Sequence, residues 1–135
     1  MGLYLRTMSA GAILVVDDNA AVSAAIRNYI EGTTPHRVCA EARNGVEAIE
    51  KATELHCDLI VLDLLMPLLN GVEAASIIRR MVPGAKIVGM TMSGDEFERA
   101  VLASRDFDAV LSKSDGLAKL AEAVTSLLDH AAETT

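Results

Sequence analysis

Aromatic residues are scarce in this sequence of 135 residues, where they make up 3% of the chain and tryptophan is absent. Hydrophobic residues nevertheless account for 51% of the chain, so the core has to be built from Val, Ile, Leu, Ala and Met. A chain of this length forms one domain that is large enough to bury a sizeable core. An aliphatic core of this kind favours a parallel sheet that is covered by helices.

Basic segments and long apolar segments are also lacking. The formal net charge is −7 and the sequence pI is about 4.8, which argues against direct binding of a nucleic-acid backbone by this chain. No apolar run approaches the roughly 20 residues of a membrane span, and the first residues contain no apolar stretch of signal-peptide length. We therefore expect a cytoplasmic protein without a membrane partner.

Cysteine is limited to Cys39 and Cys57. Their spacing matches neither a zinc motif nor a Cys-x-x-Cys motif, so we interpret both as small buried thiols.

Strand-like and helix-like segments alternate five times along the chain. The expected strands are 13–16, 37–42, 59–63, 86–91 and 109–112, and the expected helices are 19–31, 46–55, 71–81, 96–104 and 115–130. In the second helix we expect Val46, Ile49 and either Ala52 or Thr53 to face the sheet. Repeated strand–helix units of this length predict a doubly wound parallel sheet with helices on both faces. We expect a leader at 1–11, the folded domain at 12–130 and a tail at 131–135.

Acidic residues follow two of the apolar runs. Asp63 ends the run 59–62, and Asp17 and Asp18 follow the run 13–16. A buried carboxylate needs a cation or hydrogen-bond donors, and the carboxyl ends of parallel strands meet at one edge of the sheet. Three converging carboxylates repel one another, and a hard divalent cation such as Mg²⁺ is the usual relief.

The later strands also end in polar residues, because Thr91 ends the fourth run and Lys113 follows the fifth. Each residue alone has a simple explanation: Asp18 as a helix cap, Thr91 as a strand former and Lys113 as a solvated amine. Polar groups at the ends of four different strands together predict a site at that edge.

These polar residues stand in an order and at intervals that are typical of a known family. The residues concerned are Asp17, Asp18, Asp63, Met66, Pro67, Gly71, Thr91 and Lys113. They resemble the motifs of the receiver domain of bacterial two-component response regulators, over about Ala12 to His130. The Lys-Ser-Asp start of the last helix is more similar to the NarL/FixJ-like branch. The resemblance implies a flavodoxin-like (βα)5 fold with strand order 2-1-3-4-5.

The resemblance also implies a function for the site. Asp63 would accept a phosphoryl group from a sensor histidine kinase or a phosphotransfer protein. Mg²⁺ would be held by Asp17, Asp18, Asp63 and the backbone carbonyl of Leu65.

Two further residues would contact the phosphate. Lys113 would pair with one phosphate oxygen, and the hydroxyl of Thr91 would donate to another once phosphorylation draws it inward. Such a domain is a signalling module that catalyses its own phosphorylation and slow dephosphorylation. It acts on an output domain or a second copy through the fourth helix, the fifth strand and the last helix.

Three positions depart from the family's pattern. Val110 stands where an aromatic residue is usual, so we expect the switch to involve the loop 92–95 more than a side chain at position 110. Met92 replaces a small residue and Leu65 a polar one, and both would slow hydrolysis of an aspartyl-phosphate unless their side chains turn outward.

Other functions are compatible with parts of the pattern. A receiver-like module that acts without phosphorylation fits the departures at Val110 and Met92. A haloacid-dehalogenase-like phosphatase needs a second Asp where this chain has Leu65. A flavin or nucleotide binder needs a glycine-rich or hydroxyl-rich phosphate loop where this chain has Asp17, Asp18 and Asn19.

Overall fold

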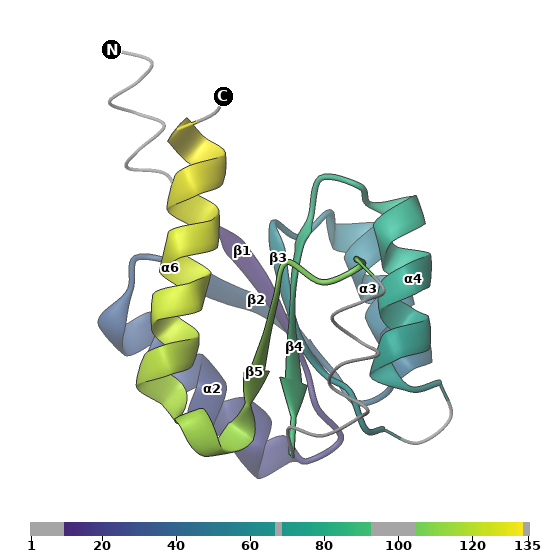
Figure 1. The fold of residues 1–135 in the computed structure, drawn as a ribbon, viewed down its shortest axis with the longest axis horizontal. Coiled ribbons are helices and arrows are strands. Elements are labelled where there is room, and N and C mark those ends of the chain that lie inside the picture. The colour runs from purple at the N-terminus through teal and green to yellow at the C-terminus, as the bar shows by residue number, and fades with distance from the viewer. Residues whose placement is uncertain (1–9, 67–68, 93–104, 134–135) are drawn as a thin grey trace.

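The computed structural model describes residues 10–66, 69–92 and 105–133. Strands and helices alternate through these ranges (Figure 1). The strands are β1 (Ala12–Val16), β2 (Arg37–Ala42), β3 (Leu59–Asp63), β4 (Lys86–Thr91) and β5 (Ala109–Ser112). The helices are α2 (Ala20–Thr33), α3 (Gly45–Leu55), α4 (Gly71–Met81), the 3-10 turn η1 (Lys113–Asp115) and α6 (Leu117–Glu133). The helix expected at 96–104 lies outside the described residues.

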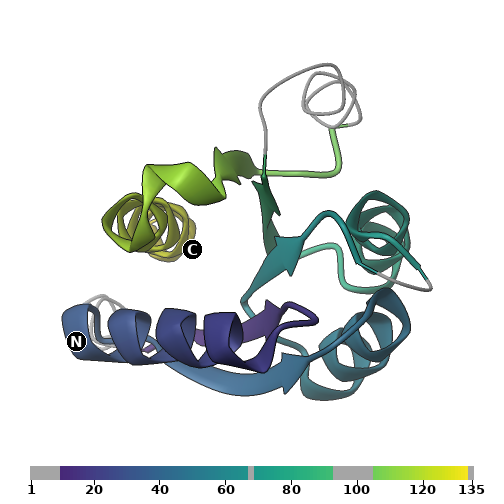
Figure 2. The same ribbon diagram turned by 90° about the horizontal axis from the view of Figure 1, so that it is seen from below.

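The strands form one parallel sheet in the order β2-β1-β3-β4-β5, which confirms the predicted fold. Helices α3 and α4 cover one face of this sheet, and α2 and α6 cover the other (Figure 2). Every residue of the central strand β3 is buried. Because parallel strands are covered on both faces, the apolar run 59–62 has no alternation of polar residues.

Two separate cores lie against the two faces of the sheet. Residues of β1 alternate between them, since Leu14 and Val16 pack with α3 and α4 whereas Ile13 and Val15 pack with α2 and α6. Full burial of an aliphatic side chain of this size contributes about 1.5–3 kcal/mol, so these two cores provide most of the stabilisation.

Asparagine begins each of the helices that follow β1, β2 and β3. Asn19, Asn44 and Asn70 accept hydrogen bonds from backbone N–H groups in the first turns of α2, α3 and α4. Caps of this kind are worth about 1 kcal/mol each, and they start each helix within a few residues of the strand end. The cap of α2 is Asn19, so the explanation of Asp18 as a helix cap is wrong.

The predicted buried face of α3 is confirmed at Ala52 and Ile49 but is wrong at Val46. Val46 is 47% exposed, and the residues buried in this helix are Gly45, Ala48 and Ala52, with Ile49 partly buried. The small residues face the sheet because they let the helix approach it closely. The last helix also begins later than predicted, since residues 113–115 form the 3-10 turn η1.

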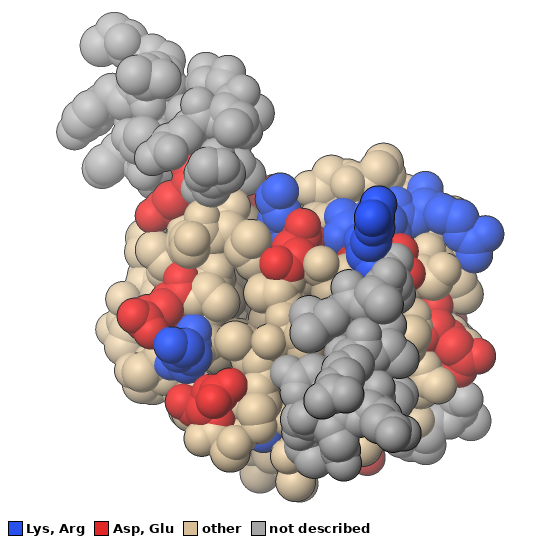
Figure 3. All heavy atoms as spheres, viewed as in Figure 1, with Lys and Arg blue, Asp and Glu red and all other residues tan. Residues whose placement is uncertain are grey.

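Charged side chains are mixed on the face seen in Figure 3. Acidic groups are spread among neutral ones, and basic groups gather near the end of α4, whose last turn carries Arg79 and Arg80. Among the described residues, no helix is long and apolar enough to cross a membrane.

Candidate functional site

The carboxyl ends of β1 and β3 place acidic side chains beside each other. Val16 of β1 is in register with Leu62 of β3, so Asp17 and Asp63 occupy the next position on these two neighbouring strands. Both are buried, whereas Asp18 is exposed. One oxygen from each of these three carboxylates lies within 4.8 Å of the others. The structure thus brings together the acids that the sequence places at the strand ends.

Lys113 lies between the two buried carboxylates. Its Nζ atom is 3.1 Å from Asp17 Oδ2 and 3.3 Å from Asp63 Oδ2. Lys113 follows β5, which is separated from β3 by β4, so its side chain reaches across the end of β4. In this structure the amine itself relieves the repulsion between the acids, a contact that the sequence prediction did not include.

The surroundings of Asp63 and of Lys113 shift the pKa of both groups. Burial raises the pKa of Asp63, although the Leu65 N–H and the Lys113 ammonium oppose that rise and the charge of Asp17 adds to it. For Lys113, burial favours the neutral amine, but the hydrogen bond to Asp17 and the charge of Asp63 outweigh burial and raise its pKa. Lys113 therefore stays charged at neutral pH.

The backbone after Asp63 is held against the start of α4. The Leu65 N–H donates to Asp63 Oδ1 at 3.1 Å, and the Gly71 N–H donates to the Leu64 carbonyl at 3.1 Å. A Cβ atom at Gly71 would lie 2.5 Å from the carbonyl oxygen of Asp63, closer than real Cβ atoms come. Glycine at position 71 therefore allows α4 to begin directly beside the acidic strand end.

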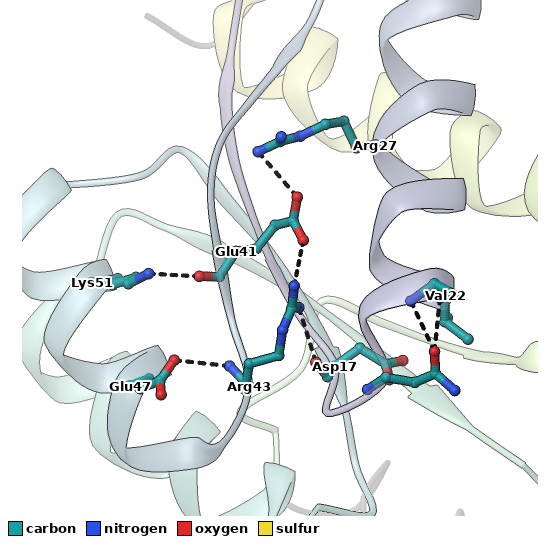
Figure 4. Close-up of polar contacts among 9 residues, drawn as sticks. Asp17, Val22, Arg27, Glu41, Arg43, Glu47 and Lys51 are labelled. Carbon is teal, nitrogen blue, oxygen red and sulfur yellow. Dashed lines mark hydrogen bonds and ion pairs between the residues drawn. The ribbon is translucent and has the colours of Figure 1, made fainter.

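Asp17 is fixed by contacts that sequence reasoning missed. Its Oδ1 atom accepts the Asn19 N–H at 2.9 Å, and its carbonyl oxygen accepts from Arg43 Nη1 at 3.3 Å. Arg43 also pairs with Glu41, which pairs with Arg27, and Figure 4 shows this chain of side chains running from α2 to Asp17. The hydrogen bond from Arg43 lowers the pKa of Glu41 despite its burial. The signal available in the sequence was an arginine directly after the strand 37–42.

Thr91 ends β4 and is buried. Asp63 is in register with Met90, so Thr91 lies one residue beyond the level of Asp63 on the neighbouring strand.

The expected loop response falls on residues 92–95, of which only Met92 is among the described residues. The side chains of Leu65 and Met92 are exposed. Val110 is partly buried in β5, in register with Gly89.

The donor set fits a hard divalent cation such as Mg²⁺. Three carboxylates offer one oxygen each within 4.8 Å, and the exposure of Asp18 leaves room for the water ligands that Mg²⁺ retains. A bound cation would compete with Lys113, because the amine already contacts the Oδ2 atoms of Asp17 and Asp63. That the Leu65 carbonyl is a further ligand stays a prediction.

Comparison with known proteins identifies the class. Residues 13–125 match the model of the response regulator receiver domain, so this chain belongs to that family. Response regulator protein VraR from Staphylococcus saprophyticus is 34% identical over 112 residues, which are 83% of this chain and 54% of VraR. The chain thus spans about half the length of this relative.

Solved structures agree with this assignment. A LuxR-family two-component response regulator from Aurantimonas sp. SI85-9A1 is 30% identical with a TM-score of 0.82, over 89% of this chain and 86% of that one. The response regulator domain of Thermotoga maritima CheB is 26% identical with a TM-score of 0.78, over 93% and 98% of the two chains. The relationship to VraR and to the LuxR-family protein supports the predicted NarL/FixJ-like branch.

Proposed function

We propose that this chain is the phosphoacceptor domain of a two-component response regulator, and that Asp63 accepts the phosphoryl group. The observation that carries the proposal is the position of Asp63, a buried carboxylate at a strand end that faces both an acidic pair and the Lys113 ammonium. The donor would be a sensor histidine kinase or a phosphotransfer protein in the cytoplasm.

In the proposed reaction, a carboxylate oxygen of Asp63 attacks the phosphorus atom and the bond from phosphorus to the donor breaks. Burial disfavours the ionised form of Asp63, but the Lys113 ammonium and the Leu65 N–H favour it, and the ionised form is the nucleophile. Mg²⁺, held by Asp17, Asp18, Asp63 and the Leu65 carbonyl, would supply neutralisation of the phosphoryl charge. Lys113 would then turn from the carboxylates to a phosphate oxygen, and Thr91 would donate to another.

The proposed consequence is a change at the surface that contacts the partner. An output domain or a second copy would bind the surface made by the helix expected at 96–104, β5 and α6, within a receiver domain spanning 12–130. A ligand or modification shifts such an equilibrium only through contacts that differ between the two states, and the candidates here are Thr91 and the loop that follows it.

Phosphorylation by acetyl phosphate with Mg²⁺ tests the proposal. We expect the parent chain to gain one acid-stable, hydroxylamine-sensitive phosphoryl group by intact mass and Asp63→Asn to gain none. Asp58→Asn is the matched control because Asp58 precedes the same strand at its opposite end. Equal labelling of Asp63→Asn would exclude Asp63 as the acceptor. Partner binding by a chain that cannot be labelled would favour the phosphorylation-independent module.

A further inference from the structure

Cys39 lies at an irregularity in the edge strand β2. Ile13 pairs with Val38 and Leu14 pairs with Ala40, so Cys39 is an extra residue in this strand. Val38 packs in the core beside α2 and α6, whereas Ala40 packs in the core beside α3 and α4. Successive residues of a strand take opposite faces, so Cys39 lies opposite Val38 on the side of α3, and the extra residue places Ala40 on that side as well.

Cys39 lies against Cys57. The two sulfur atoms are 3.5 Å apart. Cys57 lies in the connection from α3 to β3 and is buried in the core beside α3, whereas Cys39 is exposed. The interpretation of both cysteines as buried thiols is therefore wrong for Cys39. A thiol that solvent can reach lies in contact with one that solvent cannot reach.

We propose that Cys39 and Cys57 are a reversible redox pair, in which Cys39 is the site of oxidation by peroxides and Cys57 closes an intramolecular disulfide. The bond would join β2 to the α3–β3 connection. Cys57 precedes β3 and Asp63 ends it, so the disulfide would form at the end of the strand opposite to the proposed phosphoacceptor. Oxidation and phosphorylation are then separable modifications of one domain.

The chemistry balances with peroxide as the oxidant. The Cys39 thiolate attacks one peroxide oxygen, the O–O bond breaks, and the released hydroxide takes up a proton to leave as water, which yields a sulfenic acid on Cys39. The Cys57 sulfur then attacks the Cys39 sulfur and the S–O bond breaks. The sulfenic hydroxyl leaves with the Cys57 proton as a second water. A thiol reductant reverses the reaction by thiol–disulfide exchange.

Exposure assigns the two roles, because peroxide can reach Cys39 in solvent whereas Cys57 is buried. Burial, the Cys39 thiol and the charge of Asp58 raise the pKa of Cys57 to about 12, so Cys57 is a poor nucleophile towards peroxide and has to lose its proton as it attacks the adjacent Cys39 sulfur. Bond formation requires the sulfurs to close from 3.5 Å to about 2.05 Å. Because β2 lies at the edge of the sheet and is bulged at Cys39, a shift of this size affects little other packing.

Mass spectrometry of the intact chain tests the pair. Reduced protein is treated with hydrogen peroxide, its remaining thiols are blocked with a maleimide, and the disulfide is located by peptide mapping without reductant. We expect a monomer that has lost two hydrogen atoms and has no thiol left for the maleimide to block. Its digest should contain a peptide linked through Cys39 and Cys57, and dithiothreitol should restore both thiols. The oxidised monomer should also melt higher by roughly 5–10 °C, because the bond restricts the unfolded chain.

Single variants separate this outcome from unrelated oxidation. Cys57→Ala should stop at a Cys39 sulfenic acid that dimedone traps, and Cys39→Ser should stay reduced, with Cys57 unreactive to maleimide until the chain is unfolded. Circular dichroism checks the fold of each variant, and Cys57→Ser replaces Cys57→Ala if that variant does not fold. A parent chain that forms only Cys39-linked dimers, overoxidises Cys39 beside a free Cys57, or forms the bond only in denaturant would overturn the proposal.

Discussion

At the scale of single residues, the ionisation of Asp63 results from a competition between burial and Lys113. Burial is the larger influence and raises the pKa of Asp63, even though the Lys113 amine lies 3.3 Å from its Oδ2 atom. The ionised form of Asp63 is thus less favourable in the folded protein than in the unfolded chain. A group that binds a cation and accepts a phosphoryl group gains from this arrangement, because either event relieves the unfavourable charge.

The first prediction concerns pH. Because the pKa of Asp63 is raised in the folded state, the folded chain keeps the Asp63 proton over a pH range, beginning near 3.8, in which the unfolded chain has lost it. The free energy of unfolding should therefore fall as pH rises through this range. Asp63→Asn should remove that fall and be more stable than the parent at pH 7 without metal, and similar to it below about pH 3, where both states carry the proton.

Urea titrations between pH 3 and 8 measure this effect. Asp18→Asn is the control, because it removes the same charge from an exposed position beside the site. A parent and an Asp63→Asn variant whose stabilities differ equally at every pH would contradict the burial argument.

A second prediction at this scale concerns the lifetime of the aspartyl-phosphate. Leu65 and Met92 are 57% and 64% exposed, so any shielding of the phosphate rests on the part of each side chain that lies against the site. If they exclude the attacking water, Leu65→Asn combined with Met92→Ala should speed dephosphorylation about tenfold, an effect of about 1.4 kcal/mol on the barrier.

A matched control is the pair Leu55→Asn and Met81→Ala. These substitutions are of the same types at exposed positions, and they lie at the last residues of α3 and α4, away from Asp63. Loss of phosphate is followed by intact mass over time. An unchanged rate in the Leu65 and Met92 variant would mean that both side chains are only apolar surface.

At the scale of elements, the start of α4 is the most constrained junction of the site. The Asn70 side chain accepts from the Glu73 N–H and the Glu73 side chain accepts from the Asn70 N–H. Both of these backbone N–H groups in the first turn therefore have a hydrogen-bond acceptor. Gly71 lets this capped turn lie directly against the backbone of Asp63 and Leu64. The geometry of the backbone at Asp63 therefore depends on the first residue of the helix.

The third prediction compares two helical glycines. Gly71→Ala places a methyl group 2.5 Å from the Asp63 carbonyl oxygen, so it should lower the free energy of unfolding by about 1–3 kcal/mol and slow phosphorylation. Gly32→Ala in α2 meets nothing within 4 Å and should raise stability by about 0.5–1 kcal/mol with unchanged phosphorylation. Chemical denaturation and acetyl phosphate labelling measure both effects, and equal stabilities of the two variants would contradict the packing argument.

At the scale of the whole molecule, the site exists because one sheet edge collects residues from distant parts of the chain. Asp17 follows β1, Asp63 ends β3 and Lys113 follows β5, and the sheet order puts these strand ends on one edge. Anything that binds this edge only in the folded state stabilises the whole fold.

The fourth prediction is that Mg²⁺ raises the free energy of unfolding, by about 1.4 kcal/mol at ten times its dissociation constant. Asp18→Ala should lose most of this gain. It should also be slightly more stable than the parent without metal, because one repelling charge is gone. Glu50→Ala, which removes an exposed acid from α3, is the control and should respond to Mg²⁺ as the parent does. Thermal melting with and without Mg²⁺ measures these differences, and an undiminished response in Asp18→Ala would place the cation elsewhere.

Local patterns in the sequence determined the elements and the positions of their polar ends. The bounds of β2, β4, β5 and α4 agree with the predicted ranges, because apolar runs, turn residues and caps act over a few neighbouring residues. The presence of acids and a lysine at strand ends followed from the same patterns, and the parallel sheet then required them to share an edge.

Tertiary structure decided which of these groups touch and which faces meet. Lys113 contacts Asp17 and Asp63 across 96 and 50 residues of sequence, and no local pattern specifies whether its amine lies on the acids or in water. The choice of Ala48 over Val46 for the buried face of α3 depends on how closely that helix approaches the sheet. The contact of Cys39 with Cys57 joins an edge strand to the connection before β3, 18 residues further along the chain, so it follows from packing and not from a local pattern.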